Sequence, residues 1–589
     1  MSTFIPMKKI TVFILIVLFV SACSVVGVHF RLHNPKRAGK YPEPTKALTL
    51  LGNQDSRFRS CYDVTYYNLC FDFGDQLNDK TSIEGWTTMT AIAIEDCDTI
   101  QVDLHENMEL LGVTQITNYS PDNEETADAK YYREAGAVFV ILAQPRVQSL
   151  EFKIKIHFKG VPPTAKRPPW RGGFVRKKDD LGNPWWGVAC QSEGASMWWA
   201  CKDVVNDEPL GATVSFFVPN GLTAVSNGQL DYHETCEDGE EYYKWKITYP
   251  INLYNITFYI GKYKLLHDTY TSKVTGDTLA LNHYVLEQHY DKAKEHFKQL
   301  KDHLAFYEDM FGPYPFYHDG FKLVESPYAG MEHQTAIAYG NKFKNNFYGF
   351  DYIILHETAH EWWGNSLTAY DLAEGWLHEG FATYAECLYV ERTKGYNAYL
   401  QYLQNYKWTI INRRPVVGVY GLRYFNYKDG DIYTKGAWIL HTLRTTINND
   451  SVFFDIIKTF ATRYMYKNVT TEDFMDVVNE KTGSNYFWFF NQYCHNRFVP
   501  EFEYYQDKGV LYYEWNPEYV NQNFPMRVVV KTGVSRYDTI PADIAADTIH
   551  CDPGVPVVFP QRVLVKFTER KFLKRDFNAN LNAAKELRY

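Results

Sequence analysis

The first half of the chain alternates between apolar and polar residues. The clearest run is 152–159, Phe-Lys-Ile-Lys-Ile-His-Phe-Lys, and residues 212–218 and 244–249 show a similar pattern. Successive side chains of a β-strand point to opposite faces, so this alternation predicts strands with one buried face. We therefore expect a β-rich domain over residues 51–265.

After residue 265 the apolar positions take a helical spacing. Between residues 286 and 311 they recur every three or four positions, and Gly312 follows as a stop signal. Residues 376–390 and 470–483 contain two more predicted helices. Residues 266–499 thus form a predicted, mostly helical domain. We expect four histidines around its first helix to lie at the surface: His283, His289, His296 and His303.

Beyond Pro500 the strand pattern returns. Gly509 separates two aromatic-rich runs, and residues 526–531 and 562–568 also predict strands. Residues 500–589 are therefore a predicted small β domain. A chain of 589 residues is too long for one hydrophobic core, and its segments together predict an α+β multidomain fold.

The N-terminus has the features of an export signal. Two lysines precede an apolar run at 10–20 that is too short to cross a bilayer as an ordinary helix. Residues 1–22 are a predicted signal peptide. Val-Ser-Ala-Cys at 20–23 resembles a bacterial lipoprotein box, which would make Cys23 the first mature residue and the site of membrane attachment through a lipid. A plain signal peptide and an uncleaved anchor are the alternatives.

Each of these alternatives places the protein outside the cytoplasm. We expect it in the cell envelope as a membrane-anchored lipoprotein, in the periplasm or at the outer membrane. Residues 23–50 contain three prolines and several charges, and this composition predicts a tether.

Composition argues against some kinds of partner and site. The formal net charge is −9 and is spread without long runs. Phosphate binding requires concentrated Lys and Arg, so we expect no nucleic-acid partner. Nine cysteines follow Cys23, an odd number whose spacings match no zinc finger. Cys190 and Cys201 are a candidate disulfide pair.

The segment His356-Glu357-Thr358-Ala359-His360 carries candidate metal chemistry. Positions i and i+4 of an α-helix lie on one face, so His356 and His360 can bind one metal ion. Catalytic zinc takes three protein ligands and keeps one position open. Glu357 can lean over that position and take a proton from an activated water.

A side chain from a neighbouring helix can supply the third ligand. The candidates are Asp371, Glu374, His378, Glu379 and Glu386. Glu379 and Glu386 are seven residues apart and share a helix face. One can therefore bind the metal while the other hydrogen-bonds a ligand histidine. Spacing alone does not say which of these two glutamates binds the metal.

These motifs resemble the aminopeptidase N family of gluzincin metallopeptidases, which includes leukotriene hydrolase, with the lipoprotein box indicating a bacterial lipoprotein-like member. Besides 356–360, the similarity includes Trp-Leu-His-Glu-Gly-Phe-Ala at 376–382, Ala-Gly-Met-Glu-His at 329–333 and Tyr-Thr-Lys-Gly-Ala at 433–437. It runs from about Tyr62 to the C-terminal region. The resemblance implies a saddle-like β domain, a thermolysin-like catalytic domain and a C-terminal β-sandwich.

The resemblance also implies how a metal is held and used. His356, His360 and Glu379 would bind one Zn²⁺ ion, and Glu386 would hydrogen-bond a ligand histidine. Glu357 would be the general base that later returns its proton to the leaving amine.

The remaining implied residues contact the substrate. Tyr433 would donate a hydrogen bond to the oxyanion, and Glu332 would bind the free α-amine through a charge-assisted hydrogen bond. Gly330 would let the substrate backbone approach closely, with Met331 beside it.

The chain departs from the family pattern near this amine site. Ala329 replaces a glycine and His333 replaces an asparagine, which affects the pocket for the first substrate side chain. A second amine-binding residue is expected from the first domain. Gln191 fits that position best, and Glu193 takes it if the alignment moves by two residues.

The sequence therefore predicts a zinc aminopeptidase that acts on peptides with a free N-terminus. One alternative is a thermolysin-type endopeptidase, against which Glu332 argues. Another is a catalytically inactive, lipid-anchored binding protein, against which the complete set of ligands, base and tyrosine argues. An epoxide-hydrolase activity has no support in the sequence.

Overall fold

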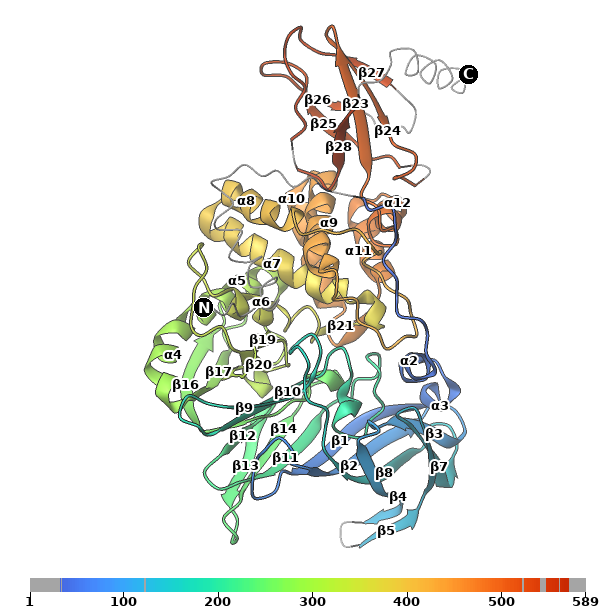
Figure 1. Ribbon diagram of the computed structural model, residues 1–589, viewed down its shortest axis with the longest axis vertical. Coiled ribbons are helices and arrows are strands. Elements are labelled where there is room, and N and C mark those ends of the chain that lie inside the picture. Colours follow the sequence, from blue (N-terminus) through green and yellow to red (C-terminus); the bar gives the residue numbers. More distant parts are fainter. Residues whose placement is uncertain are drawn as a thin grey trace, which may run out of the picture.

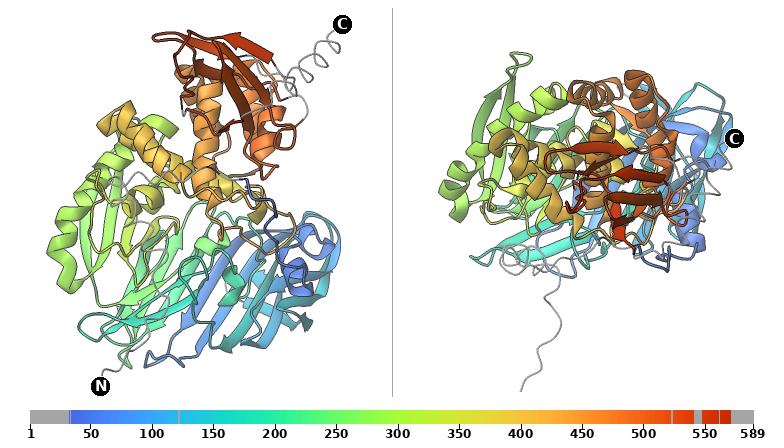
Figure 2. Two further views of the ribbon diagram at one scale, coloured as in Figure 1. Left: turned by 45° about the horizontal axis from the view of Figure 1, so that its top comes forward. Right: turned by 90° about the horizontal axis from the view of Figure 1, so that it is seen from above.

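The computed structural model describes residue 32 and residues 34–120, 123–521, 524–540, 547–560 and 562–570. This part of the chain forms an N-terminal β domain, a central domain of a five-stranded sheet, a short strand pair and many helices, and a small C-terminal β domain (Figures 1 and 2). The expected α+β multidomain fold is confirmed. The predicted signal peptide and Cys23 lie outside the described residues. Within these ranges, no helix is both long and apolar enough to cross a membrane.

The N-terminal domain is built on an eight-stranded sheet. In spatial order its strands are β13 (Gln229–Thr235), β14 (Glu241–Ile247), β11 (Ala212–Val218), β1 (Tyr62–Asp72), β2 (Ile83–Ala93), β8 (Glu151–Gly160), β4 (Met108–Ser120) and β5 (Asn123–Asp128). The alternating run at 152–159 is β8, whose apolar side chains are buried while the residues between them are more exposed. Only β1 and β11 pair in parallel in this sheet.

Two smaller sheets and two short helices complete this domain. One sheet contains β3 (Cys97–Asp103), β7 (Ala137–Arg146) and β6 (Lys130–Glu134). The other contains β12 (Thr223–Val225), β15 (Tyr259–Gly261), β10 (Pro184–Ala189) and β9 (Gly173–Lys178). The helices are α2 (Lys46–Gly52) and α3 (Arg57–Ser60).

The central domain begins with a five-stranded sheet. Its spatial order is β16 (Tyr263–Thr271), β17 (Thr278–Leu286), β18 (Lys322–Glu325), β20 (Ala336–Tyr339) and β19 (Gly330–Met331). Strand β19 pairs antiparallel with β20, and no strand among the described residues pairs with its other side. That free edge is a place where an extended peptide can add as another strand.

Helices between and after these strands form the other layer of this domain (Figure 1). They are α4 (Tyr290–His296), α5 (Leu300–Phe311), α6 (Tyr352–Ala359), α7 (Trp376–Lys394), α8 (Tyr396–Lys407), α9 (Asp431–Ile447), α10 (Asp450–Arg463), α11 (Thr471–Thr482) and α12 (Phe487–Tyr493). A short parallel pair, β21 (Leu367–Ala369) and β22 (Lys467–Val469), lies among them.

Three helix predictions can be compared with the structure. The predicted helix at 376–390 is α7, and the one after Thr470 is α11, with a capping box at its start and left-handed Gly483 at its end. The predicted continuous helix at 286–311 is instead divided into α4 and α5 by a 3-10 turn at Phe297–Gln299.

The expectation of surface histidines around this segment is wrong for His283 and His303. Both are buried, at 2% and 0% exposure. His283 accepts a hydrogen bond from Leu323 N at 2.9 Å, and its ring lies 5.2 Å from that of Phe297. Burial lowers the pKa of His283 to about 3, so this ring is a neutral part of the core.

The C-terminal domain consists of two small sheets. One contains β27 (Asp547–His550), β24 (Val510–Trp515), β23 (Glu501–Asp507) and β28 (Lys566–Glu569). The other contains β25 (Val528–Lys531) and β26 (Tyr537–Ile540). The apolar residues of the C-terminal domain belong to the same core cluster as the helices of the central domain. Phe524 connects the two domains, because its ring contacts Trp515 of β24 and Trp488 of α12.

The predicted tether is wrong from Asn34 onward, because this segment is packed against the central domain. The Asn34 side chain exchanges two hydrogen bonds with the backbone of Val499, at 2.8 and 3.1 Å. Gly39 N donates to Arg413 O at 2.8 Å. Proline and charge suggested a flexible linker, but the backbone groups of this segment find partners on the folded surface.

The candidate disulfide between Cys190 and Cys201 is not formed. All nine cysteines from Cys61 to Cys551 are free thiols. Cys190 and Cys201 are both fully buried in the core of the N-terminal domain.

Candidate metal centre

Local sequence explains why the two motif histidines share a face. The Asp351 side chain caps α6 by accepting a hydrogen bond from Ile353 N at 3.0 Å. The helix ends at Ala359, but His360 keeps helical dihedral angles of φ −64° and ψ −18°. The i, i+4 relation between His356 and His360 is therefore preserved.

Three donor atoms of the predicted ligands converge. His356 Nε2 and His360 Nε2 are 3.2 Å apart, and each lies 3.4 Å from Glu379 Oε2. A tetrahedral zinc ion with bonds of about 2.0–2.1 Å holds its ligand atoms about 3.3–3.4 Å apart. Glu379 Oε2 is buried and makes no hydrogen bond. The spacing and the unsatisfied oxygen both fit a zinc ion.

The opposite nitrogen of each histidine fixes which atom faces the ion. His360 Nδ1 lies 2.8 Å from the carbonyl oxygen of Trp363, which can only accept. His356 Nδ1 lies 2.8 Å from Glu386 Oε1. Each Nδ1 therefore carries the proton, and each Nε2 presents a lone pair to the ion.

Glu386 is held by two tyrosines on α8. Its Oε2 accepts hydrogen bonds from Tyr402 at 2.6 Å and Tyr406 at 2.8 Å. Both carboxylate oxygens are thus engaged away from the ion. Glu386 therefore orients His356, the second of the two roles that its spacing left open.

The other candidate ligands point elsewhere. Asp371 caps a short turn by accepting from Ala373 N at 2.8 Å. Glu374 accepts a hydrogen bond from Thr471 at 2.6 Å. His378 Nε2 accepts from Ala369 N at 2.7 Å. Glu379 is the member of the set that faces both histidines, from the first turn of α7, where the helix dipole favours an anion.

The Glu357 carboxylate lies beside the ligand set and close to Gly330 of β19. A Cβ atom added to Gly330 would stand 2.5 Å from Glu357 Oε1, so a larger residue there would displace the Glu357 carboxylate. Burial raises the pKa of Glu357 to about 8, and a cation held beside it would lower that value. Glu357 is thus a carboxylate placed between the metal ligands and the free edge of the sheet.

Glu332 forms the centre of a second polar cluster. Its Oε1 accepts hydrogen bonds from Gln191 Nε2 at 2.6 Å and from Tyr254 OH at 3.2 Å. Glu193, the alternative to Gln191, instead accepts from Gly172 N at 2.7 Å. The geometry therefore favours Gln191 as the partner of Glu332. Burial raises the pKa of Glu332.

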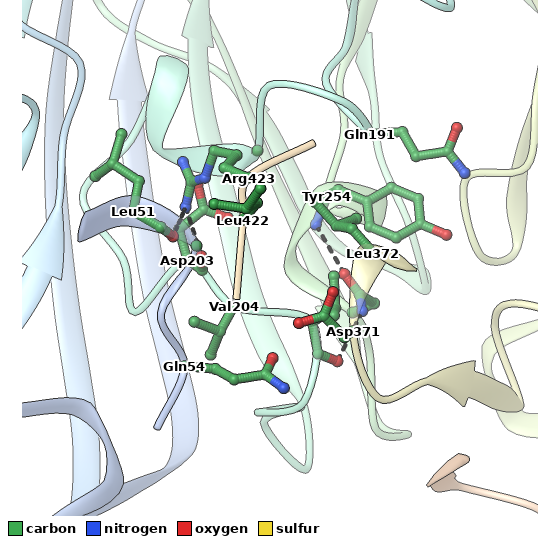
Figure 3. Close-up of a pocket in the computed structure, with 14 residues that line it drawn as sticks. Leu51, Gln54, Gln191, Asp203, Val204, Tyr254, Asp371, Leu372, Leu422 and Arg423 are labelled. Carbon is green, nitrogen blue, oxygen red and sulfur yellow. Dashed lines mark hydrogen bonds and ion pairs between the residues drawn. The ribbon is translucent and has the colours of Figure 1, made fainter. Parts of the chain in front are cut away.

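The two partners of Glu332 come from the N-terminal domain. Gln191 follows β10, and Tyr254 lies in a 3-10 turn at Leu253–Asn255. Figure 3 shows both at one end of a small cavity of about 30 Å³ between the domains. At the other end, Arg423 of the central domain forms an ion pair with Asp203 at 2.8 Å.

Tyr433 lies in the first turn of α9, next to the predicted ligand His356. Its ring stacks on His356 with the ring centroids 6.3 Å apart. Burial raises the pKa of Tyr433 well above its ordinary value, and the negative charge of the Glu379 carboxylate adds to this. The phenol is therefore a neutral hydrogen-bond donor next to the ligand set.

Several residues of the site were missed by sequence reasoning. Tyr254, Tyr402 and Tyr406 contact site carboxylates, but nothing in their local sequence separates them from the other tyrosines, 46 in all. The Trp363 carbonyl was also missed, although its place three residues after His360 is a usable signal.

The comparisons with known sequences agree with this geometry. Residues 295–493 match the Peptidase family M1 domain. The chain is 27% identical to endoplasmic reticulum aminopeptidase 1 of Rattus norvegicus over 273 residues, which are 42% of this chain and 28% of that protein. It is 25% identical to aminopeptidase N of Streptomyces lividans over 300 residues, or 46% of this chain and 34% of that protein. The matched region thus spans about a third of these relatives.

Solved structures share the fold over most of the chain. An M1 zinc metallopeptidase mutant of Deinococcus radiodurans bound to a Tyr-Ser-Ala substrate superposes with a TM-score of 0.63 at 19% identity, covering 76% of this chain and 98% of that one. The M1 zinc metallopeptidase from the same organism gives a TM-score of 0.61 at 20% identity, covering 74% and 94%. Residues 295–493 are therefore similar to the peptidase family M1 domain, and the chain has the fold of the M1 zinc metallopeptidases.

Proposed function

We propose that this protein is a zinc aminopeptidase that hydrolyses the N-terminal peptide bond of peptides. The observation that carries the proposal is the position of Glu332. Ligand atoms of Glu332, Glu357 and His360 all lie within 4.8 Å of one another. A carboxylate that binds a free α-amine there leaves room for a single residue before the bond that Glu357 faces.

The cofactor of the proposed enzyme is one Zn²⁺ ion held by His356, His360 and Glu379. When bound, zinc acts as a Lewis acid that polarises the scissile carbonyl and makes a water molecule more acidic. The hydrogen bonds to Glu386 and to the Trp363 carbonyl keep both histidines oriented for it.

The chain's own residues perform the proton transfers. Glu357 accepts the proton of the attacking water and delivers it to the leaving amine. Tyr433 donates its O–H to the carbonyl oxygen as negative charge develops there. The free edge of β19 aligns the substrate backbone, and Gly330 lets that backbone approach Glu357.

Glu332 restricts the reaction to chain ends. An ammonium group donates to the carboxylate in a charge-assisted hydrogen bond, while an internal peptide bond carries no charge to pair. The names of the curated relatives, both aminopeptidases, support this reading. So does the description of a similar M1 zinc metallopeptidase structure as bound to L-arginine.

The proposal is tested with a panel of fluorogenic amino-acid amides and one peptide in free and N-acetylated forms. We expect hydrolysis of some amides and of the free peptide, loss of activity with a chelator, and recovery on adding Zn²⁺. The acetylated peptide should resist cleavage. Cleavage of internal bonds in the acetylated peptide would identify an endopeptidase, and bound zinc without any turnover would identify an inactive binding protein.

We also propose that the protein is exported and anchored in the cell envelope through a lipid on Cys23. The support is the sequence of residues 1–23, a basic start, a short apolar run and a lipoprotein box. In a bacterial host, Cys23→Ser should release the protein from the membrane fraction and abolish its labelling with palmitate. Membrane attachment that survives this substitution would contradict the lipid anchor.

A further inference from the structure

Glu332 lies where regular strand pairing ends. Strand β19 pairs with β20 through Gly330 and Met331, and Glu332 is the next residue. Thr335, which follows shortly after, has a φ of +59°, so the chain turns sharply away from the sheet. The main chain of Glu332 therefore needs a partner other than a strand to fix its position.

Asn365 supplies that partner. Its Nδ2 donates to the Glu332 carbonyl oxygen at 2.9 Å, and both residues are buried. A carbonyl oxygen can only accept, so this contact also fixes which way the Asn365 amide is turned. Its Oδ1 then faces Asn255, from whose Nδ2 it accepts a hydrogen bond at 2.8 Å. Both ends of the Asn365 side chain are thus engaged.

The main chain of Asn365 is attached to a predicted zinc ligand. Asn365 N donates to the carbonyl oxygen of His360 at 3.0 Å, shortly after α6 ends at Ala359. This contact uses backbone atoms alone, so it does not depend on the Asn365 side chain. Asn365 therefore connects the main chain of a metal ligand with the main chain of Glu332.

Asn255 extends this network to the N-terminal domain. It is the last residue of the 3-10 turn that also carries Tyr254. The Tyr254 hydroxyl donates to Glu332 Oε1 at 3.2 Å. The side chain of Asn365 thus holds the Glu332 main chain and also contacts the turn that supplies a partner for the Glu332 carboxylate.

The distance between Glu332 and His360 matters because both would act on one substrate molecule. Glu332 would bind the ammonium group, and the zinc ion held by His360 would bind the carbonyl of the same residue. A displacement of about 1 Å between groups that hold one substrate can cost about a hundredfold in rate. A fixed link between the two is therefore worth preserving.

We propose that Asn365 is a positioning residue for Glu332. It holds the Glu332 main chain at a set distance from His360, and so keeps the ammonium group one residue away from the scissile bond. This inference rests on the proposed aminopeptidase function and names what keeps the amine site in register with the metal centre.

The substitution Asn365→Ala removes both side-chain hydrogen bonds, adds no charge and keeps the backbone contact to His360. We expect kcat/KM on an amino-acid amide to fall about tenfold. The preference for a free over an N-acetylated peptide should fall by a similar factor. A loss of overall stability alone would leave that preference unchanged.

Binding supplies a readout that is independent of turnover. By calorimetry on zinc-loaded protein, Asn365→Ala should weaken the free amino acid of the best amide substrate about tenfold. Competition with a chelator should show zinc bound as tightly as in the wild type.

A double substitution tests whether Asn365 acts through Glu332. In a Glu332→Gln background, Asn365→Ala should lower kcat/KM by less than about a further twofold, because the carboxylate that it positions is already gone.

The matched control is Asn34→Ala. Asn34 is also a buried asparagine whose Nδ2 donates to a carbonyl oxygen of a distant segment, that of Val499, at 2.8 Å. Its Oδ1 accepts a hydrogen bond as well, from Val499 N at 3.1 Å. Its replacement should leave the free-amine preference and the amino-acid affinity unchanged.

Asn255→Ala tests the link from the N-terminal domain and decides the matter if Asn365→Ala does not fold. The Asn255 main chain stays held, because its carbonyl oxygen accepts from Asn227 Nδ2 at 2.9 Å. The substitution therefore acts on the contact to Asn365. We expect it to lower the free-amine preference about threefold.

Three results would overturn the proposal while the proposed function stands. One is a wild-type free-amine preference in Asn365→Ala or, if that variant does not fold, in Asn255→Ala. Another is an equal loss from Asn365→Ala with and without the Glu332 carboxylate. The third is weaker zinc binding that accounts for the loss, which would make Asn365 a support of His360. Wild-type protein that hydrolyses no amide would instead overturn the proposed function and this inference with it.

Discussion

The substitution Glu357→Gln is expected to reduce kcat by about two to four orders of magnitude while zinc stays bound. Glutamine has nearly the same shape as glutamate but cannot take up a proton from water. The three predicted ligands, His356, His360 and Glu379, converge without any contribution from Glu357. Turnover of a fluorogenic amide and the zinc content of the purified protein measure the two properties separately.

A matched control lies four residues along the chain. Glu361 is also a buried glutamate, but it accepts hydrogen bonds from Thr335 N at 2.9 Å and Tyr314 at 2.8 Å, away from the ligand set. Glu361→Gln should keep kcat within about tenfold of the wild type. Near-normal turnover by Glu357→Gln would refute the general-base role, and loss of zinc would show that Glu357 helps to hold the ion.

The second large effect is expected at Glu332. Glu332→Gln should lower kcat/KM on substrates with a free amine about a hundredfold, because a neutral amide loses the charge-assisted hydrogen bond to the ammonium group. The ratio of rates on free and N-acetylated peptides should fall by a similar factor. Competition between the two peptides in one reaction measures this ratio directly.

Glu325→Gln serves as the comparison for that change. Glu325 is a buried glutamate at the end of β18, and it accepts a hydrogen bond from Leu286 N at 2.9 Å and contacts His289. Its replacement should leave the preference for a free amine intact. If Glu332→Gln kept that preference as well, another group would have to bind the amine.

Local spacing was enough to predict the part of the site that lies on one helix. His356, Glu357 and His360 share a short segment whose geometry follows from helical periodicity. Choosing between Glu379 and Glu386 required the packing of α7 against α8, because the tyrosines that engage Glu386 lie on α8. No spacing rule contains that information.

The parts contributed by the other domain were harder to predict. The alignment favoured Gln191 over Glu193, and the fold shows that Gln191 contacts Glu332 while Glu193 accepts from Gly172. Tyr254 reaches the site through a tertiary contact with Glu332, which is distant in the sequence. Such contacts depend on domain packing, which a local pattern does not encode.

Composition predicted the wrong environment for two sets of polar residues, because contacts with other parts of the fold decide where they lie. The proline-rich and charged residues after Asn34 resemble a linker, yet they find hydrogen-bond partners on the central domain. His283 and His303 resemble surface residues, yet neighbouring elements cover them. In both cases another part of the folded chain supplies partners or cover for polar groups, which composition does not predict.

The way the five-stranded sheet packs makes the two larger domains dependent on each other. Val324, Met331 and Ala338 of that sheet belong to the apolar cluster of the N-terminal domain, not to that of the helices. A fragment that began at the five-stranded sheet would expose this apolar face to water and would lack Gln191 and Tyr254. Exchanging the first domain would therefore also replace two of the side chains that hydrogen-bond Glu332.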